Sequence, residues 1–88
     1  MKKIYLVVFL LITAFAFSQP LKAVVKQAKK DFKAQNYKGA VDGYTKALAL
    51  KPNTFAFLVS RAIAYEKLTQ YKEAVADYKQ ALVLKKTA

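Results

Sequence analysis

The sequence contains one stretch twice, and this internal repeat limits the possible folds more than any other feature. Residues 37–51, YKGAVDGYTKALALK, align without a gap with residues 71–85, YKEAVADYKQALVLK. Tyrosine, alanine, valine and leucine recur at the same places in both stretches. Self-similarity with a period of about 20 to 50 residues is typical of proteins that stack one small structural unit on the next. The sequence therefore predicts two stacked copies of one unit.

The spacing of the apolar residues indicates that each unit is a pair of helices. Ala62, Tyr65 and Leu68 recur at every third position, and a polar corner at Thr69 and Gln70 follows them. A second apolar set comes after this corner and consists of Ala74, Val75, Tyr78, Ala81 and Leu82. Both sets match the 3.6-residue period of a helix and not the alternation of a strand. We therefore expect an all-α fold built from helical hairpins.

Residues that favour helix ends delimit four helices, which we expect at about residues 21–35, 37–51, 54–68 and 71–86. Asn36 provides a side-chain acceptor in front of the second helix. Pro52 ends that helix, because the residue before a proline is pushed out of the α region. Asn53 or Thr54 is expected to cap the third helix.

Gly39 and Gly43 lie one turn apart inside the second helix. A glycine in a helix interior costs about 1 kcal/mol relative to alanine. Two interpretations are open: the glycines allow another helix to approach closely, or they mark a weak helix in a diverging repeat. The sequence alone favours the second interpretation.

The 34-residue period and the residues at fixed places within it resemble the tetratricopeptide repeat (TPR) family. The alanine-x3-aromatic element of the family's motif is present as Ala40-x3-Tyr44 and as Ala74-x3-Tyr78. The resemblance implies two hairpins, or four antiparallel helices, in a short right-handed superhelical array. It also implies a set of repeat-packing residues, which is Ala28, Tyr37, Ala40, Tyr44, Ala47, Pro52, Ala62, Tyr65, Tyr71, Ala74, Tyr78 and Ala81.

The chain departs from the TPR motif at a few places. Asp31 stands where the first copy should carry an aromatic residue, a space that the neighbouring Phe32 could fill. Val24 and Leu58 replace the motif's tryptophan, and Lys86 stands at the place of the second closing proline. We expect a TPR domain over residues 19–88, with repeat one at about 21–54 and repeat two at about 55–88.

Residues 1–18 have the pattern of a secretory signal peptide. Lys2 and Lys3 give a positive start, and residues 4–17 are apolar apart from Thr13. Ala16-Phe17-Ser18 then places small residues where a signal peptidase reads them. The alternative is an uncleaved membrane anchor at residues 4–17, although a membrane-spanning helix needs about 20 apolar residues. We therefore expect export to the periplasm or the medium, with membrane attachment only if this segment stays uncleaved.

The composition argues against an enzyme. The 88 residues include no histidine and no cysteine, which removes the usual zinc ligands and nucleophile–base pairs. No glycine-rich phosphate loop is present, so we expect no cofactor. Glu73 and Asp77 lie one helical turn apart, but Lys72 and Lys79 flank them. We interpret this pair of acids as part of a solvated charged face and not as a catalytic pair.

Lysines dominate the first predicted helix. The formal net charge is +11, or +9 once Lys2 and Lys3 are removed with the signal peptide. Five lysines form a ridge at helical spacing, namely Lys22, Lys26, Lys29, Lys30 and Lys33. The TPR resemblance places the first helix of each hairpin along the concave groove, so this ridge could bind an acidic partner. A solvated lysine face that keeps the protein soluble is the alternative, and a single arginine argues against nucleic acid.

The last predicted helix leaves part of its apolar face without a neighbour. Stacked repeats stabilise one another and generally need a polar capping element, yet Val75, Leu82 and Val83 lie on this final helix. We expect these three residues to form an assembly face that meets another copy of the chain or a different protein. Truncation of a longer gene product would explain the uncovered face equally well.

Together these features predict an exported, non-enzymatic TPR module for protein–protein interaction. Two alternatives stay open: a basic module that binds polyanions or anionic membrane surfaces, and a self-associating structural part of a larger assembly.

Overall fold

The computed structural model describes residues 20–87, and all four expected helices are present there. They are α2 (Leu21–Lys33), α3 (Tyr37–Leu50), α4 (Phe55–Lys67) and α5 (Tyr71–Thr87). Each begins and ends close to its expected bounds. The predicted signal peptide lies outside the described residues. None of the helices between residues 20 and 87 is both long and apolar enough to cross a membrane.

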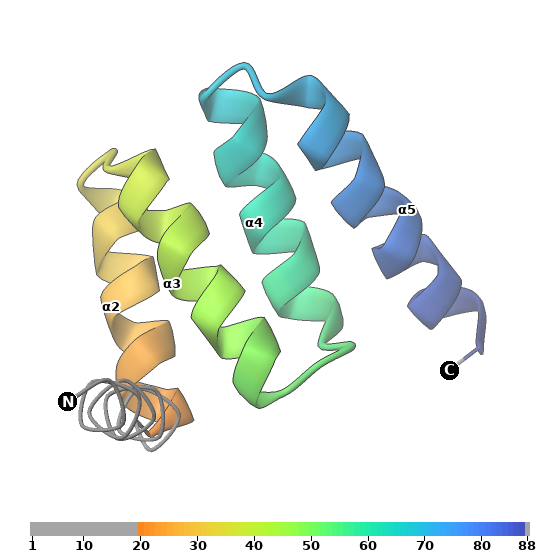
Figure 1. Ribbon diagram of the computed structural model, residues 1–88, viewed down its shortest axis with the longest axis horizontal. Coiled ribbons are helices and arrows are strands. Elements are labelled where there is room, and N and C mark those ends of the chain that lie inside the picture. Colours follow the sequence, from red (N-terminus) through yellow and green to blue (C-terminus); the bar gives the residue numbers. More distant parts are fainter. Residues whose placement is uncertain (1–19, 88) are drawn as a thin grey trace, which may run out of the picture.

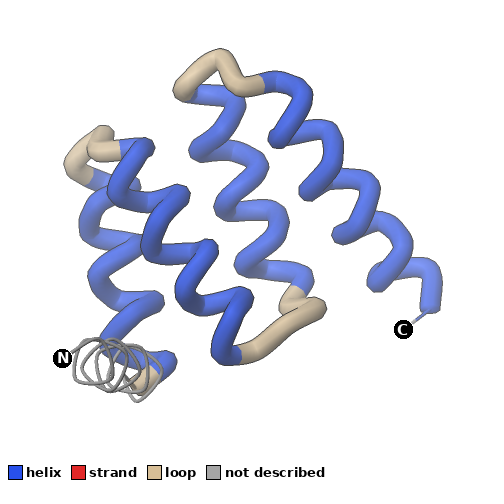
Figure 2. The backbone as a smooth tube through the Cα atoms, in the orientation of Figure 1, coloured by secondary structure: helices blue, strands red, loops and turns tan. Residues whose placement is uncertain are grey.

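The helices pack in chain order as two antiparallel hairpins (Figure 1). α2 packs on α3 and α4 packs on α5, while α3 and α4 join the two hairpins. The connecting turns alternate between the two ends of the array, and α2 and α5 are its outermost helices (Figure 2). The all-α fold of two TPR-type hairpins is therefore confirmed.

The repeat extends to the backbone of the turns. Gln35 and Thr69, which occupy equivalent positions in the two repeats, both adopt a left-handed conformation with φ of 62° and 59°. After each of them, the next amide donates back into the preceding helix: Asn36 N to Asp31 O at 2.8 Å, and Gln70 N to Tyr65 O at 2.9 Å. This bond from the residue beyond the left-handed position is the Schellman closure of a helix end. Both hairpins therefore turn in the same way.

A side chain caps the N-terminus of α3, as expected, but no side chain caps the N-terminus of α4. The Asn36 side chain accepts a hydrogen bond from Gly39 N at 3.2 Å, which confirms Asn36 as the cap of α3. Thr54 occupies the N-cap position of α4, but its side chain makes no capping bond. Its hydroxyl instead donates to Lys51 O at 2.8 Å and holds the turn between the hairpins.

Alanine dominates the buried interior. Ten hydrophobic residues of the described region are buried, and seven of them are alanines: Ala28, Ala40, Ala47, Ala62, Ala64, Ala74 and Ala81. Val24 and Leu58, which replace the motif's tryptophan, are buried with them. The distance between packed helices depends on the side chains at the contact, so small residues here bring the helices close together.

Gly43 shows how close this approach is. A Cβ atom added to Gly43 would lie 2.6 Å from Ala28 Cβ and 3.1 Å from Ala28 Cα. The interpretation that this glycine only marks a weak helix is therefore wrong, because α2 occupies the space that a side chain would need. At Gly39 the nearest atoms belong to the Asn36 and Asp31 side chains and not to the backbone of another helix, so a Cβ there would disturb the Asn36 cap without meeting the backbone of α2.

We expect Gly43→Ala to lower the free energy of unfolding by about 1–2 kcal/mol. Overpacking costs up to about 3 kcal/mol, and the better helix propensity of alanine returns about 1 kcal/mol. Urea denaturation followed by circular dichroism measures this change. Gly39→Ala is the matched control and should lose less stability. A Gly43→Ala variant as stable as the parent would contradict the close approach of α2 and α3.

Candidate functional site

A hollow of about 320 Å³ lies where the first helices of both hairpins meet the second helix of the first hairpin. α2, α3 and α4 all contribute to its lining, which consists of Lys29, Phe32, Lys33, Tyr44, Ser60 and Ile63. Three of these side chains are large and apolar or aromatic, while two lysines and a serine are polar. The hollow therefore offers an apolar floor with positive charge beside it.

Aromatic contacts hold the floor in place. Tyr44 is buried, and its ring lies 6.2 Å from the ring of Phe57 on α4. Phe32 packs edge-on against Tyr37 with ring centres 5.4 Å apart. Aromatic pairs in this geometry add about 0.5–1.5 kcal/mol beyond the area that they bury. The floor is thus set by contacts between helices and does not depend on a ligand to form.

The five lysines of the predicted ridge are all exposed, but only two of them line the hollow. Lys29 and Lys33 line the hollow. Lys22, Lys26 and Lys30 are exposed on the same helix and are absent from its lining. The structure thus separates two lysines that border a hollow from three that face solvent.

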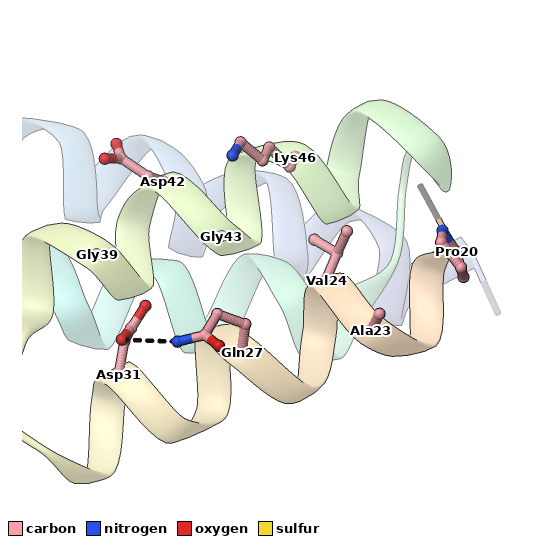
Figure 3. Close-up of a pocket in the computed structure, with 9 residues that line it drawn as sticks. All are labelled: Pro20, Ala23, Val24, Gln27, Asp31, Gly39, Asp42, Gly43 and Lys46. Carbon is pink, nitrogen blue, oxygen red and sulfur yellow. Dashed lines mark hydrogen bonds between the residues drawn. The ribbon is translucent and has the colours of Figure 1, made fainter. Parts of the chain in front are cut away.

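A larger hollow, of about 540 Å³, lies on the opposite edge of α2, between α2 and α3 (Figure 3). Gly39 and Gly43 line this hollow, and their lack of a side chain helps to form it. Its charged groups are Asp31, Asp42 and Lys46, and Gln27 donates to the Asp31 carboxylate at 3.2 Å. It has no aromatic floor and mixes both signs of charge, so the smaller hollow is the better candidate site.

An ion pair joins the helices of the second hairpin. Arg61 Nε donates to Asp77 Oδ2 and Arg61 Nη2 donates to Asp77 Oδ1, both at 2.7 Å. Asp77 is buried, so the interpretation that it belongs to a solvated face is wrong. The hydrogen bonds that Arg61 donates to Asp77 raise the pKa of Arg61 above its ordinary value, against the opposing effect of burial. Arg61 Nη1 also donates to Thr45 on α3 at 3.2 Å, so Arg61 connects three helices.

The sequence did contain a signal for this pair. Asp77 lies about one turn from both Ala74 and Ala81, which places it on the apolar face of the last helix. An acid on such a face needs a buried partner, because an unpaired buried charge is costly. Arg61, the single arginine of the chain, is that partner.

We expect Asp77→Ala to destabilise the fold by about 3–5 kcal/mol, because it leaves Arg61 without its partner in a half-buried place. Thermal and urea denaturation measure the loss. Glu73→Ala, one turn earlier and exposed, is the matched control and should change stability by about 0.5 kcal/mol or less. Replacing both partners, as in Arg61→Leu with Asp77→Leu, should restore most of the loss. An Asp77→Ala variant that loses no more than Glu73→Ala would show that the pair contributes nothing.

The remaining predicted site residues lie mainly on α5. Val75, Leu82 and Val83 are 50%, 55% and 60% exposed. Tyr71 is also exposed, unlike Tyr37, its counterpart in the first repeat. The partner of Tyr37 is Phe32, and the second repeat carries Glu66 at the equivalent position.

Tyr78 is half-buried, and its hydroxyl donates to Glu66. This hydrogen bond raises the pKa of Tyr78, with a smaller contribution from burial. Among residues 20–87 no group of histidine, cysteine, aspartate and glutamate side chains could hold a metal ion.

Curated proteins with TPR repeats resemble this chain, while no family model matches it. Small glutamine-rich tetratricopeptide repeat-containing protein 2 of Mycosarcoma maydis is 35% identical over 66 residues, or 75% of this chain and 18% of that protein. Small glutamine-rich tetratricopeptide repeat-containing protein beta of Homo sapiens is 39% identical over 51 residues, or 58% of this chain and 17% of that protein. Sperm-associated antigen 1 of Mus musculus is 39% identical over 64 residues, or 73% of this chain and 7% of that protein.

The chain thus spans less than a fifth of the length of each of these relatives, so the similarity concerns a repeat region and not a whole protein. The matches cover a large part of the chain, and residues 20–87 form two antiparallel hairpins with small residues at their contacts. The period, the packing and the relatives agree, and the chain is a member of the tetratricopeptide repeat family with two repeats.

Proposed function

We propose that the chain is a non-enzymatic protein-interaction module that binds an acidic peptide segment in the hollow between α2, α3 and α4. The observation that carries this proposal is the pairing of an aromatic floor with two lysines in one concave place. Relatives that are named for their TPR repeats support a protein partner.

The lining suggests what the peptide looks like. Phe32, Tyr44 and Ile63 offer apolar surface for one aliphatic or aromatic side chain. Lys29 and Lys33 come from adjacent turns of α2, so their ammonium groups can meet carboxylates on either side of that side chain. Sites of this kind combine an apolar anchor with a few polar groups that fix orientation. An apolar residue flanked by acids fits this lining best.

The full lysine ridge supports a competing function. Lys22, Lys26 and Lys30 are exposed outside the hollow, and together with the other lysines they could bind polyanions or anionic membrane surfaces without any groove. Such binding is governed by charge alone and weakens steeply as salt rises. Binding that depends on the apolar floor should keep a salt-resistant part.

We further propose that the module works outside the cytoplasm, in the periplasm or the medium. This proposal rests on the pattern of residues 1–18, which has a positive start, an apolar middle and a small-x-small end. Mass spectrometry of the protein from the producing cells tests it, because cleavage after Ser18 gives a chain that starts at Gln19. A chain that keeps Met1 to Ser18 would contradict cleavage.

The peptide site is tested with a short fluorescein-labelled peptide in which one leucine is flanked by glutamates. We expect Lys29→Glu with Lys33→Glu to weaken its binding about tenfold or more, because charge-assisted hydrogen bonds become repulsive contacts. Fluorescence anisotropy at several salt concentrations measures the affinity.

The matched control is Lys26→Glu with Lys30→Glu, which makes the same charge change on the same helix but outside the hollow. It should weaken binding only slightly. Equal losses in both double variants, together with binding that disappears at high salt, would favour the polyanion function. A peptide in which serine replaces the leucine should bind more weakly if the floor takes part.

A further inference from the structure

The outer face of α5 repeats the surface that α3 presents to α4. The residues of α3 recur at the equivalent positions of α5 as the pairs Val41/Val75, Tyr44/Tyr78 and Leu48/Leu82. On α3 this surface lies under α4, and all three residues are buried or half-buried. On α5 no described helix covers it, and Val75 and Leu82 are 50% and 55% exposed (Figure 1). The α3–α4 contact therefore shows what kind of element fits the face of α5.

α4 meets α3 through three residues on successive turns. Phe57 lies beside Tyr44, with ring centres 6.2 Å apart. Arg61 donates to Thr45 Oγ1 at 3.2 Å. Ala64 is completely buried in a cluster with Tyr44 and two alanines. A helix that covers such a surface thus carries an aromatic residue, a polar residue and a small residue at positions i, i+4 and i+7.

The face of α5 differs from that of α3 in one decisive charge. The counterpart of Thr45 on α5 is Lys79, which is exposed. Arg61 suits the threonine, but a basic residue in the same place would be repelled by Lys79. An acidic residue would pair with it. Lys72 and Lys86 are exposed two turns away on either side and have the same sign.

We propose that the outer face of α5 is a docking surface for an acidic amphipathic helix of another protein. This helix lies on α5 as α4 lies on α3, with an acid opposite Lys79 and a small residue against Ala74 and Tyr78. The surface is separate from the hollow between α2, α3 and α4, to which α5 contributes no residue. The inference therefore goes beyond the proposed function and does not depend on it.

A second copy of the chain does not fit this surface as the next hairpin of the array. In that head-to-tail arrangement it would offer α2, whose counterparts of Phe57, Arg61 and Ala64 are Ala23, Gln27 and Lys30. Lys30 would then take the place of the completely buried Ala64. Both copies would also carry a strongly positive charge. Steric fit disfavours a head-to-tail copy, the charge disfavours any arrangement of two copies, and both favour a different, acidic partner.

The test uses two synthetic peptides that have the sequence of residues 53–70, which contains α4. One peptide is unchanged and the other carries Arg61→Glu. Isothermal titration calorimetry measures the binding of each peptide to the full chain. We expect the Arg61→Glu peptide to bind about tenfold more tightly than the unchanged peptide, because it replaces a repulsive contact with an ion pair. Lys79→Glu in the protein should reverse this preference. Leu82→Asp should weaken both peptides about tenfold or more, because it removes apolar contact area.

Two controls separate this surface from the rest of the molecule. Lys46→Glu makes the same charge change as Lys79→Glu but lies on α3, beside the larger hollow, and should leave the preference unchanged. Lys29→Glu with Lys33→Glu disables the proposed peptide hollow and should also leave it unchanged.

Three results would overturn the proposal. The two peptides could bind equally, or Lys79→Glu could fail to reverse their order. Sedimentation of the full chain could also show a dimer that Leu82→Asp converts to a monomer, which would assign the face to a second copy.

Discussion

The close approach of neighbouring helices is the constraint on which the rest of this structure depends. α2 lies so near α3 that Gly43 has no room for a side chain, and most of the buried interior is alanine. Small residues on the contact line force the large side chains to its edges. Phe32, Phe57 and Ile63 are therefore only half-buried, and two of them line the hollow beside α2. The packing of the repeat and the shape of its candidate site thus have one cause.

A core of alanines buries little apolar area, and the chain must be held together by other means as well. Small domains are marginally stable because their interior is small relative to their surface. Arg61 on α4 compensates by bonding to two other helices at once, through Thr45 on α3 and Asp77 on α5. Its guanidinium also lies 5.8 Å from the ring centre of Tyr65. The second hairpin therefore combines close packing with a paired charge, and the first hairpin relies on close packing and aromatic contacts.

The sequence predicted the fold well, because a 34-residue period and helical spacing specify elements and their order. The cap at Asn36 and the turn at Thr69 follow from local chemistry, which the sequence shows directly. Distances between helices are not local, so the role of Gly43 was misjudged. Asp77 was misjudged because the flanking Lys72 and Lys79 suggested a solvated face, while its burial depends on Arg61 on another helix. Likewise, helical spacing placed five lysines on one ridge, and only the neighbouring helices decide that two of them border the hollow.

The two ends of the described array differ in polarity. On α2, Gln27, Lys30 and Asp31 are polar and occupy the positions that Arg61, Ala64 and Tyr65 occupy on α4. The free face of α5 keeps Val75 and Leu82 from the stacking pattern and surrounds them with lysines. Apolar area alone would attract any helix, including another copy of the chain. The lysines restrict this choice, because electrostatic complementarity contributes more to specificity than to affinity. A basic rim around an apolar face therefore discourages self-association and leaves the face open to helices of opposite charge.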